Sequence, residues 1–302
     1  ILGAVAALLI LVGKLPGGWP SLFEAADAAG KFRLFNFSTD LTVPYTFWAG
    51  LVGGMVLNTA THGADQMMVQ RYLAARSQRQ AAGALVASGF VVLAQFSLFL
   101  LIGVSLWVFY QSPIAPGPGL GPSTRSDEVF SHFIATELPH GLVGLLVAAV
   151  FSSAMGTLAG SLNASASTIV NDLIRPATGW SDERRLLQVS RAMTVFWGCV
   201  LAAVAFGARG LQENVVNSAL AIASFVSGIL LGLFLLGILT RRVGQSSALV
   251  GMLGGLAAVS YARFGTPLAW PWLALVGSST VFLVGLLASL ILPEPGPSRE
   301  TS

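Results

Sequence analysis

Long runs without a charged side chain are the feature that most restricts how this chain can fold. No acidic or basic residue occurs between His140 and Asp172, and most of that stretch is apolar. A helix needs about 20 predominantly apolar residues to cross a bilayer. Of the 302 residues, 54% are hydrophobic and 10% are charged, whereas soluble domains carry about 25% charged residues. We therefore expect an all-α integral membrane protein.

About eight transmembrane helices are expected from the apolar runs. The predicted spans are residues 1–12, 46–70, 83–110, 139–171, 188–208, 214–240, 246–263 and 270–292. The chain begins in mid-helix without a Met, so the first span is expected to be truncated and the chain to be a piece of a longer protein. Arginines favour the loops after the second, fourth and sixth spans, which predicts that these loops are cytoplasmic.

The composition excludes several other classes of protein. The net charge of +3 is spread over loops, with no basic helix face, so nucleic acid is not an expected partner. Cys199 is the only cysteine, which excludes an intrachain disulfide. The sequence has no GxSxG, HExxH or phosphate-binding loop. An enzyme is therefore not expected.

Hydroxyl groups are unusually frequent in the uncharged stretch at residues 142–172. Ser153 and Thr157 are four residues apart and share one helix face, with Gly156 beside them. Such a face could touch something polar, including a bare ion, because hydroxyl and carbonyl oxygens suit hard cations. Small residues also let two membrane helices pack closely, and this second interpretation is the simpler one.

The second predicted span is the most polar of them. Its segment at residues 57–73 contains Asn58, Thr61 and His62, and glycines weaken the helix around it. Secondary transporters build binding sites from interrupted helices of this kind. A structural role for Asn58 and His62 remains equally open. A lone histidine without neighbouring ligand residues does not predict a metal site.

The same segment carries Asp65, the only acid well inside a predicted span. An ionisable side chain within a membrane segment is a candidate functional residue. The simpler hypothesis is that Asp65, Gln66 and Arg71 form a structural network at the cytoplasmic end of the helix.

Three stretches of the chain resemble the sodium/solute symporter family. GADQMMVQRYLAAR at residues 63–76 is similar to one family signature. The stretch at 138–174, LPHGLVGLLVAAVFSSAMGTLAGSLNASASTIVNDLI, resembles a second conserved helix, and residues 227–242 resemble a third segment. Relatives of the sodium/glucose, sodium/proline and sodium/iodide cotransporters share these features.

The resemblance implies a fold of two inverted repeats with five helices each, as in LeuT-like transporters. Residues 1–292 would form a partial transporter domain, in which 1–12 end the fifth core helix. Residues 46–240 would be the second inverted repeat and 246–292 the peripheral helices. The first four core helices would lie upstream, and residues 293–302 would be a cytoplasmic tail.

The resemblance also implies a sodium site on the hydroxyl-rich helix. The Ser153 carbonyl, Gly156 and Thr157 align with the family's second sodium site. Relatives often carry two adjacent hydroxyl residues where this chain has Gly156 and Thr157, so one side-chain oxygen is lost. The remaining ligands would come from a helix upstream of Ile1.

The implied solute site differs from that of sugar carriers. Asn58 aligns with an asparagine that contacts the sugar, but Thr61 and His62 replace an aromatic pair. Ala219 stands where sugar carriers have a glutamine. We therefore expect Asn58, Thr61 and His62 to bind a small polar organic solute that is not a sugar.

The expected activity is sodium-coupled symport by alternating access. The expected partners are a sodium ion, a small-molecule solute and the lipid bilayer, with no nucleic acid and no cofactor besides the coupling ion. The expected location is the plasma (inner) membrane, with several passes. The alternatives are a symporter-like membrane sensor module and a structural membrane subunit that does not transport. The isolated 302 residues are expected not to transport, because half of the core would be missing.

Overall fold

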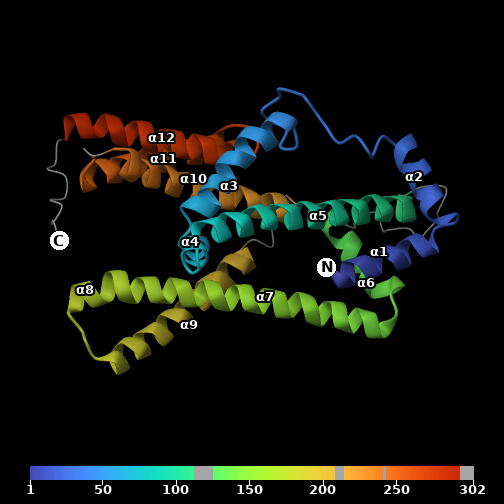
Figure 1. Ribbon diagram of the computed structural model, residues 1–302, viewed down its shortest axis with the longest axis horizontal. Helices are drawn as coiled ribbons and strands as arrows, with labels where there is room; N and C mark the ends of the chain where they lie inside the picture. The colour runs from blue at the N-terminus through green and yellow to red at the C-terminus, as the bar shows by residue number, and fades with distance from the viewer. Residues whose placement is uncertain (112–124, 208–213, 241–242, 293–302) are drawn as a thin grey trace. The chain divides into compact units, whose positions relative to one another are not determined.

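Every regular element that the computed structural model describes is a helix (Figure 1). The structure describes residues 1–111, 125–207, 214–240 and 243–292, except for the side chains of residues 66, 67, 70 and 71. The elements are α1 (Leu2–Lys14), α2 (Gly18–Ala28), the π-helix η1 (Ala49–Gly53), α3 (Gly54–Gly63), α4 (Gln66–Leu73), α5 (Gln78–Gln111), the 3-10 helix η2 (Ser126–Glu128), α6 (Val129–Glu137), α7 (His140–Thr168), the π-helix η3 (Ile169–Ile174), α8 (Arg175–Thr178), α9 (Glu183–Gly207), α10 (Val215–Leu239), α11 (Gln245–Gly265) and α12 (Pro271–Ile291). The predicted tail at 293–302 lies outside the described residues.

Six of the described helices are long and apolar enough to cross a bilayer. They are α5, α7 with its continuation through α8, α9, α10, α11 and α12. A seventh span results if α1 and α2, which bend by 89° at their junction, count as one. The chain is thus a multi-pass membrane protein.

The remaining expected span, at residues 46–70, is an interrupted helix. η1 and α3 run together from Ala49 to Gly63, and α4 starts only at Gln66. The continuous part is shorter than the roughly 20 residues that a bilayer requires. The glycines and polar residues of this segment had predicted a weakened helix, and the structure shows a break there.

The chain divides into two compact units. One comprises residues 1–29 and 93–212, and the other comprises 30–92 and 213–302. α5 leaves the second unit after Val92 and continues in the first.

Close contacts between α10, α11 and α12 form the core of the second unit. A Cβ atom added at Gly228 would lie 2.7 Å from the Ala274 Cα atom, and one added at Gly232 would lie 2.7 Å from the Ser278 carbonyl oxygen. Backbones can approach so closely only where both helices carry small residues. Val259 and Leu273 fill the space at one end of this three-helix contact and are fully buried.

The core of the first unit joins α1, α2, the second half of α5, α6 and the start of α7. Leu11, Leu22 and Ile102 are buried there, and Phe109 packs edge-to-face on Phe133 with ring centroids 5.7 Å apart. Large apolar side chains fill the core of the first unit, whereas small residues allow close helix contacts in the second unit.

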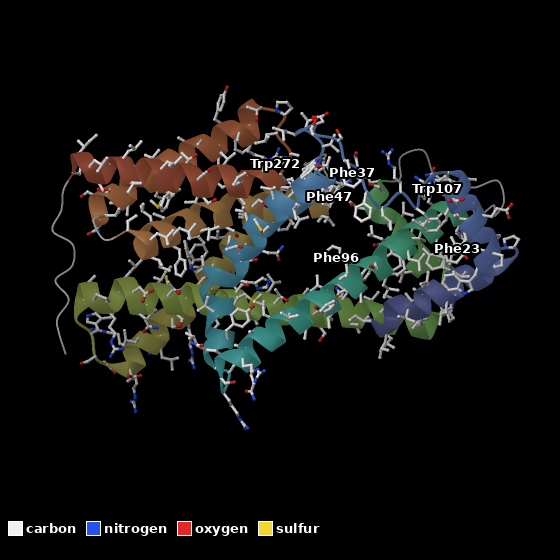
Figure 2. All side chains as sticks on the ribbon, turned by 45° about the horizontal axis from the view of Figure 1, so that its top comes forward. Phe23, Phe37, Phe47, Phe96, Trp107 and Trp272 are labelled. Carbon is white, nitrogen blue, oxygen red and sulfur yellow. The ribbon has the colours of Figure 1, made fainter. Side chains whose placement is uncertain are left out.

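An aromatic cluster lies just before the interrupted helix. Phe37 and Phe47 lie side by side in Figure 2, with ring centroids 5.1 Å apart. The Phe47 backbone N–H donates to the Asn36 carbonyl at 2.7 Å, and Ala269 N–H donates to the Leu41 carbonyl at 3.0 Å. The segment that leads into the interrupted helix is therefore hydrogen-bonded to the loop that precedes α12.

The glycine contacts between α10 and α12 give a first prediction. Gly232→Ala should destabilise the protein by about 1–3 kcal/mol, because the added methyl group meets Ser278 and Val281 in a packed core. The measurement is the thermal unfolding midpoint of the purified protein in detergent.

Gly237→Ala on the same helix is the matched control, since a Cβ atom there has no neighbour within 4 Å among the described residues. It should be neutral or stabilise by about 0.5–1 kcal/mol, because alanine loses less conformational freedom on folding. Equal effects of the two substitutions would contradict the close packing.

Candidate functional site

The interrupted helix of the second unit begins against α12. The Thr46 hydroxyl accepts the Ala49 backbone N–H at 3.1 Å and so starts the helix at the π-turn. Gly53 lies so near α12 that a Cβ atom added to it would be 2.5 Å from the Pro271 carbonyl oxygen. Only glycine fits this approach. The first turn of α3 is therefore fixed to α12.

Asn58, Thr61 and His62 share one face of α3, since residues three and four apart lie together on a helix. Leu57 and Ala60 are buried on the neighbouring side of the helix. The three predicted solute residues therefore lie together, with Asn58 exposed and Thr61 and His62 partly buried.

Two of these side chains already bond to the helix backbone. The Asn58 amide donates to the Gly54 carbonyl at 2.8 Å, and the Thr61 hydroxyl donates to the Leu57 carbonyl at 3.1 Å. These bonds leave the second amide hydrogen and the oxygen of Asn58, and the lone pairs of Thr61, for another molecule. The face can both donate and accept hydrogen bonds.

His62 has a partner that the sequence did not indicate. Its Nδ1 atom lies 2.9 Å from the hydroxyl of Tyr72, which is on α4 beyond the break. The two rings are tilted by 54° with centroids 6.4 Å apart. A spacing of ten residues would not bring these side chains together on one continuous helix, so the break creates the contact.

Asp65 occupies the break itself and starts α4. Its carboxylate accepts the Met68 backbone N–H at 3.2 Å, and its carbonyl accepts the Val69 N–H at 2.9 Å. This is the geometry of an N-cap, in which a side-chain oxygen satisfies a free N–H of the first turn. The side chains of Gln66 and Arg71 lie outside the described residues, so their network with Asp65 stays a prediction.

The predicted sodium ligands lie on α7 in the first unit. The Thr157 hydroxyl donates to the Ser153 carbonyl at 3.1 Å, and both residues are exposed. Two oxygens at this separation subtend about 80° at a cation that lies about 2.4 Å from each, close to the right angle of octahedral coordination. If the Thr157 hydroxyl hydrogen rotates away from the Ser153 carbonyl, both oxygens can coordinate a hard cation.

Gly156 adds no side chain to this face, and a Cβ atom built there has no described neighbour within 4 Å. Ser153 also borders a groove of about 890 Å³ formed with α1, α6 and the first half of α7. Its walls are mostly apolar.

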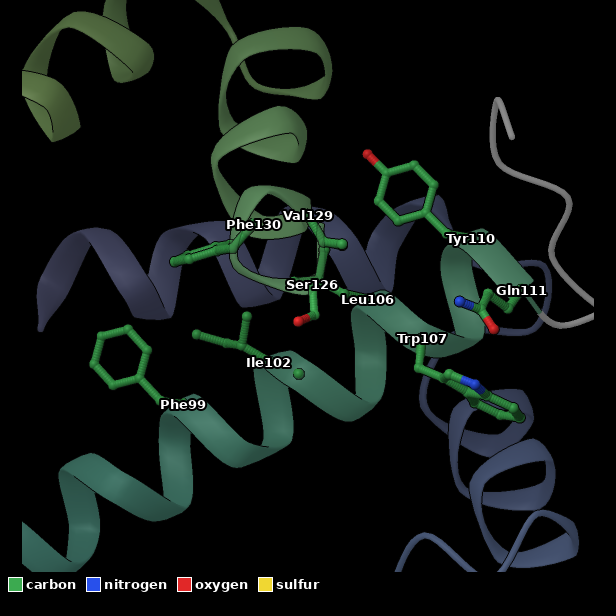
Figure 3. A pocket seen from close by; sticks show the side chains of 10 residues that line it. Phe99, Ile102, Leu106, Trp107, Tyr110, Gln111, Ser126, Val129 and Phe130 are labelled. Carbon is green, nitrogen blue, oxygen red and sulfur yellow. The ribbon is translucent and has the colours of Figure 1, made fainter. Parts of the chain in front are cut away.

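A second cavity in the first unit was not predicted. It has a volume of about 300 Å³ and lies between α5 and the segment formed by η2 and α6 (Figure 3). Phe99, Trp107 and Phe130 line it, together with the polar side chains of Gln111 and Ser126. It contains none of the predicted site residues. The aromatic residues near the end of α5 were the only feature of the sequence that could have indicated this cavity.

Comparison with known proteins gives a consistent result. The model of the sodium:solute symporter family matches residues 2–255. The human sodium/iodide cotransporter is 29% identical over 95% of this chain and 46% of its own length. The sodium/sialic acid symporter SiaT of Proteus mirabilis (strain HI4320) is 27% identical over 99% of this chain and 60% of its own length. This chain therefore spans about half the length of the curated relatives it matches.

A solved structure supports the same fold. It is the substrate-bound outward-open state of a Na⁺-coupled sialic acid symporter, with a TM-score of 0.76 and 25% sequence identity. The match covers 97% of this chain and 60% of that chain. The expected fold, part of a five-plus-five inverted repeat of the LeuT-like class, is confirmed.

The cap at the helix break gives a second prediction. Asp65→Ala should speed hydrogen exchange of the Met68 and Val69 amides about fivefold, because losing an N-cap costs about 1 kcal/mol. The measurement is amide exchange followed by mass spectrometry on the α4 peptide.

Asp65→Ser is the matched variant, because serine caps a helix without a charge. It should restore exchange to nearly the rate of the unaltered protein. Exchange as fast as in Asp65→Ala would instead indicate that the charge of Asp65 matters, as in the predicted network with Arg71.

Proposed function

This chain belongs to the sodium:solute symporter family, and we propose that the full-length protein is a sodium-coupled symporter of a small polar organic solute. Transport would proceed by alternating access. The observation that supports this most is the interrupted helix, which presents Asn58, Thr61 and His62 on one face beside a break in the backbone. Transporters use such breaks to expose hydrogen-bonding groups inside the membrane.

Asn58, Thr61 and His62 would bind the solute through their hydrogen-bonding groups. The absence of an aromatic pair at Thr61 and His62, and of an amide at Ala219, argues against a sugar. Ala219 is exposed on α10 and offers no polar group. A small acid or another polar metabolite fits this face better.

The Ser153 carbonyl and the Thr157 hydroxyl would bind the sodium ion. Their separation of 3.1 Å suits two neighbouring ligands of one cation. Gly156 contributes no oxygen from its side chain, so the site has one ligand fewer than relatives with two adjacent hydroxyl residues. The remaining ligands are expected from the helix that the resemblance places upstream.

One sodium ion suffices as the driving force. A single charge that crosses 100 mV releases about 2.3 kcal/mol, and a tenfold concentration gradient adds about 1.4 kcal/mol. The sum of about 3.7 kcal/mol supports roughly 500-fold accumulation of the solute. No cofactor besides the coupling ion is required.

We further infer that the protein is located in the plasma (inner) membrane, where such a sodium gradient exists. The matched relatives are named as transporters, so we do not propose an enzymatic activity or a nucleic-acid partner. The apolar helices would be surrounded by the lipid bilayer.

Uptake into proteoliposomes tests the coupling. The full-length protein should accumulate at least one solute from a panel of pyruvate, proline, glucose and sialic acid, by about tenfold or more with an inward sodium gradient. Liposomes without protein are the control. Equal uptake with potassium in place of sodium would refute the proposal.

The sodium site has its own test. Thr157→Ala should raise the half-saturating sodium concentration about tenfold or more, because a ligand oxygen to a charged group is lost. Thr157→Ser should keep the value within about twofold, since it retains the hydroxyl. The control is Thr168→Ala, which removes a hydroxyl from the same face of α7 about 16 Å away. An equal effect at both positions would remove Thr157 from the site.

A further inference from the structure

The contact between His62 and Tyr72 joins the two halves of the interrupted helix. The Tyr72 hydroxyl lies 2.9 Å from His62 Nδ1, within hydrogen-bond distance. His62 lies on the face of α3 that carries Asn58, whereas Tyr72 belongs to α4. Both side chains are partly buried. The tyrosine therefore contacts a residue of the proposed solute site, His62, through its Nδ1 atom.

The chemistry of the two groups decides the direction of this bond. A neutral imidazole has one nitrogen that donates and one that accepts. The unprotonated imidazole nitrogen is a much stronger base than a phenol oxygen, and a phenol hydroxyl, with a pKa of about 10, is a good donor. The favoured arrangement therefore has the Tyr72 hydroxyl donating to Nδ1.

A bond in this direction fixes the rest of the ring. The proton of the neutral His62 side chain must then lie on Nε2, on the far side of the ring from Tyr72. Among the residues that the structure describes, Nε2 has no hydrogen-bond partner. In this tautomer the N–H donor of His62 is directed away from Tyr72.

We propose that Tyr72 is a positioning residue that holds His62 in its Nε2–H tautomer, so that the site selects solutes with an acceptor oxygen, above all a carboxylate. The solute part of this inference rests on the proposed function. Asn58 has a second amide hydrogen to donate on the same face, one turn away. The Thr61 hydroxyl is already donating to the backbone. The donors of this face are thus N–H groups, which suit a carboxylate.

The tautomer can be measured without any transport. The full-length protein is labelled with ¹⁵N-histidine, and its spectrum is recorded at a pH of about 8, where free imidazole is neutral. Protonated and unprotonated ring nitrogens resonate far apart. The signals of His62 are those that disappear in His62→Gln.

The expected spectrum has His62 protonated at Nε2 alone, and Tyr72→Phe should produce a mixture of both tautomers. Tyr261→Phe is the matched control, because Tyr261 is 71% exposed on α11. It should leave the His62 signals unchanged. A proton on Nδ1 in the unaltered protein, or no change in Tyr72→Phe, would overturn the positioning role.

Uptake measures the effect on the solute, with pyruvate as the carboxylate probe. Tyr72→Phe should raise the KM for pyruvate about fivefold, the value of one neutral hydrogen bond. The maximal rate and the half-saturating sodium concentration should not change. In a His62→Gln background, Tyr72→Phe should have no further effect, because Tyr72 acts only through His62.

Each remaining outcome decides one part of the inference. An unchanged KM despite a shifted tautomer would overturn the contact between Nε2 and the solute. Uptake of glucose but not of pyruvate would overturn the carboxylate preference. If no solute is carried at all, the proposed function fails, while the spectrum still decides whether Tyr72 holds His62.

Discussion

Hydrogen bonding of the backbone is the constraint on which the rest of this structure depends. A bilayer offers no partner for a free N–H or C=O group, so each described span is a helix that satisfies its own backbone. The break at Ala64 and Asp65 interrupts this pattern between α3 and α4. There the Asp65 carboxylate replaces a missing backbone partner, which lets the chain stop one helix and start another. The interruption brings Tyr72 beside His62 and leaves a polar face on α3.

The sequence predicted most of the fold because apolar length and charge are sufficient to locate membrane helices. Six expected spans are confirmed as long apolar helices, and the interrupted one was indicated by its glycines. The 89° bend between α1 and α2 was not predicted, although Gly17 and Gly18 adopt positive φ angles that favour glycine at this turn. The contact of η1 with α12 was not predicted either, because Gly53 and Pro271 are distant in the sequence.

The candidate site was predictable in part. Asn58, Thr61 and His62 were predicted as solute residues, and the structure places them on one face of α3. Asp65 was predicted to belong to a structural network with Gln66 and Arg71, and its capping role was visible in principle, since aspartate is a preferred N-cap residue. The partner of His62 could not be predicted, because the contact with Tyr72 depends on how the chain turns at the break. The cavity beside α5 depends likewise on the position of α6, which local sequence does not determine.

The small residues between α10 and α12 have a mechanical consequence. Gly228 and Gly232 are one helical turn apart, and so are their neighbours Ala274 and Ser278. Each glycine leaves a recess that fits the facing backbone, and these recesses repeat once per helical turn. A shift of less than one turn along the axis would therefore bring larger side chains against the backbone, which opposes small sliding movements of α10 along α12. Because Gly53 abuts Pro271, the start of the interrupted helix packs against the same helix, and sliding of α12 would disturb both contacts.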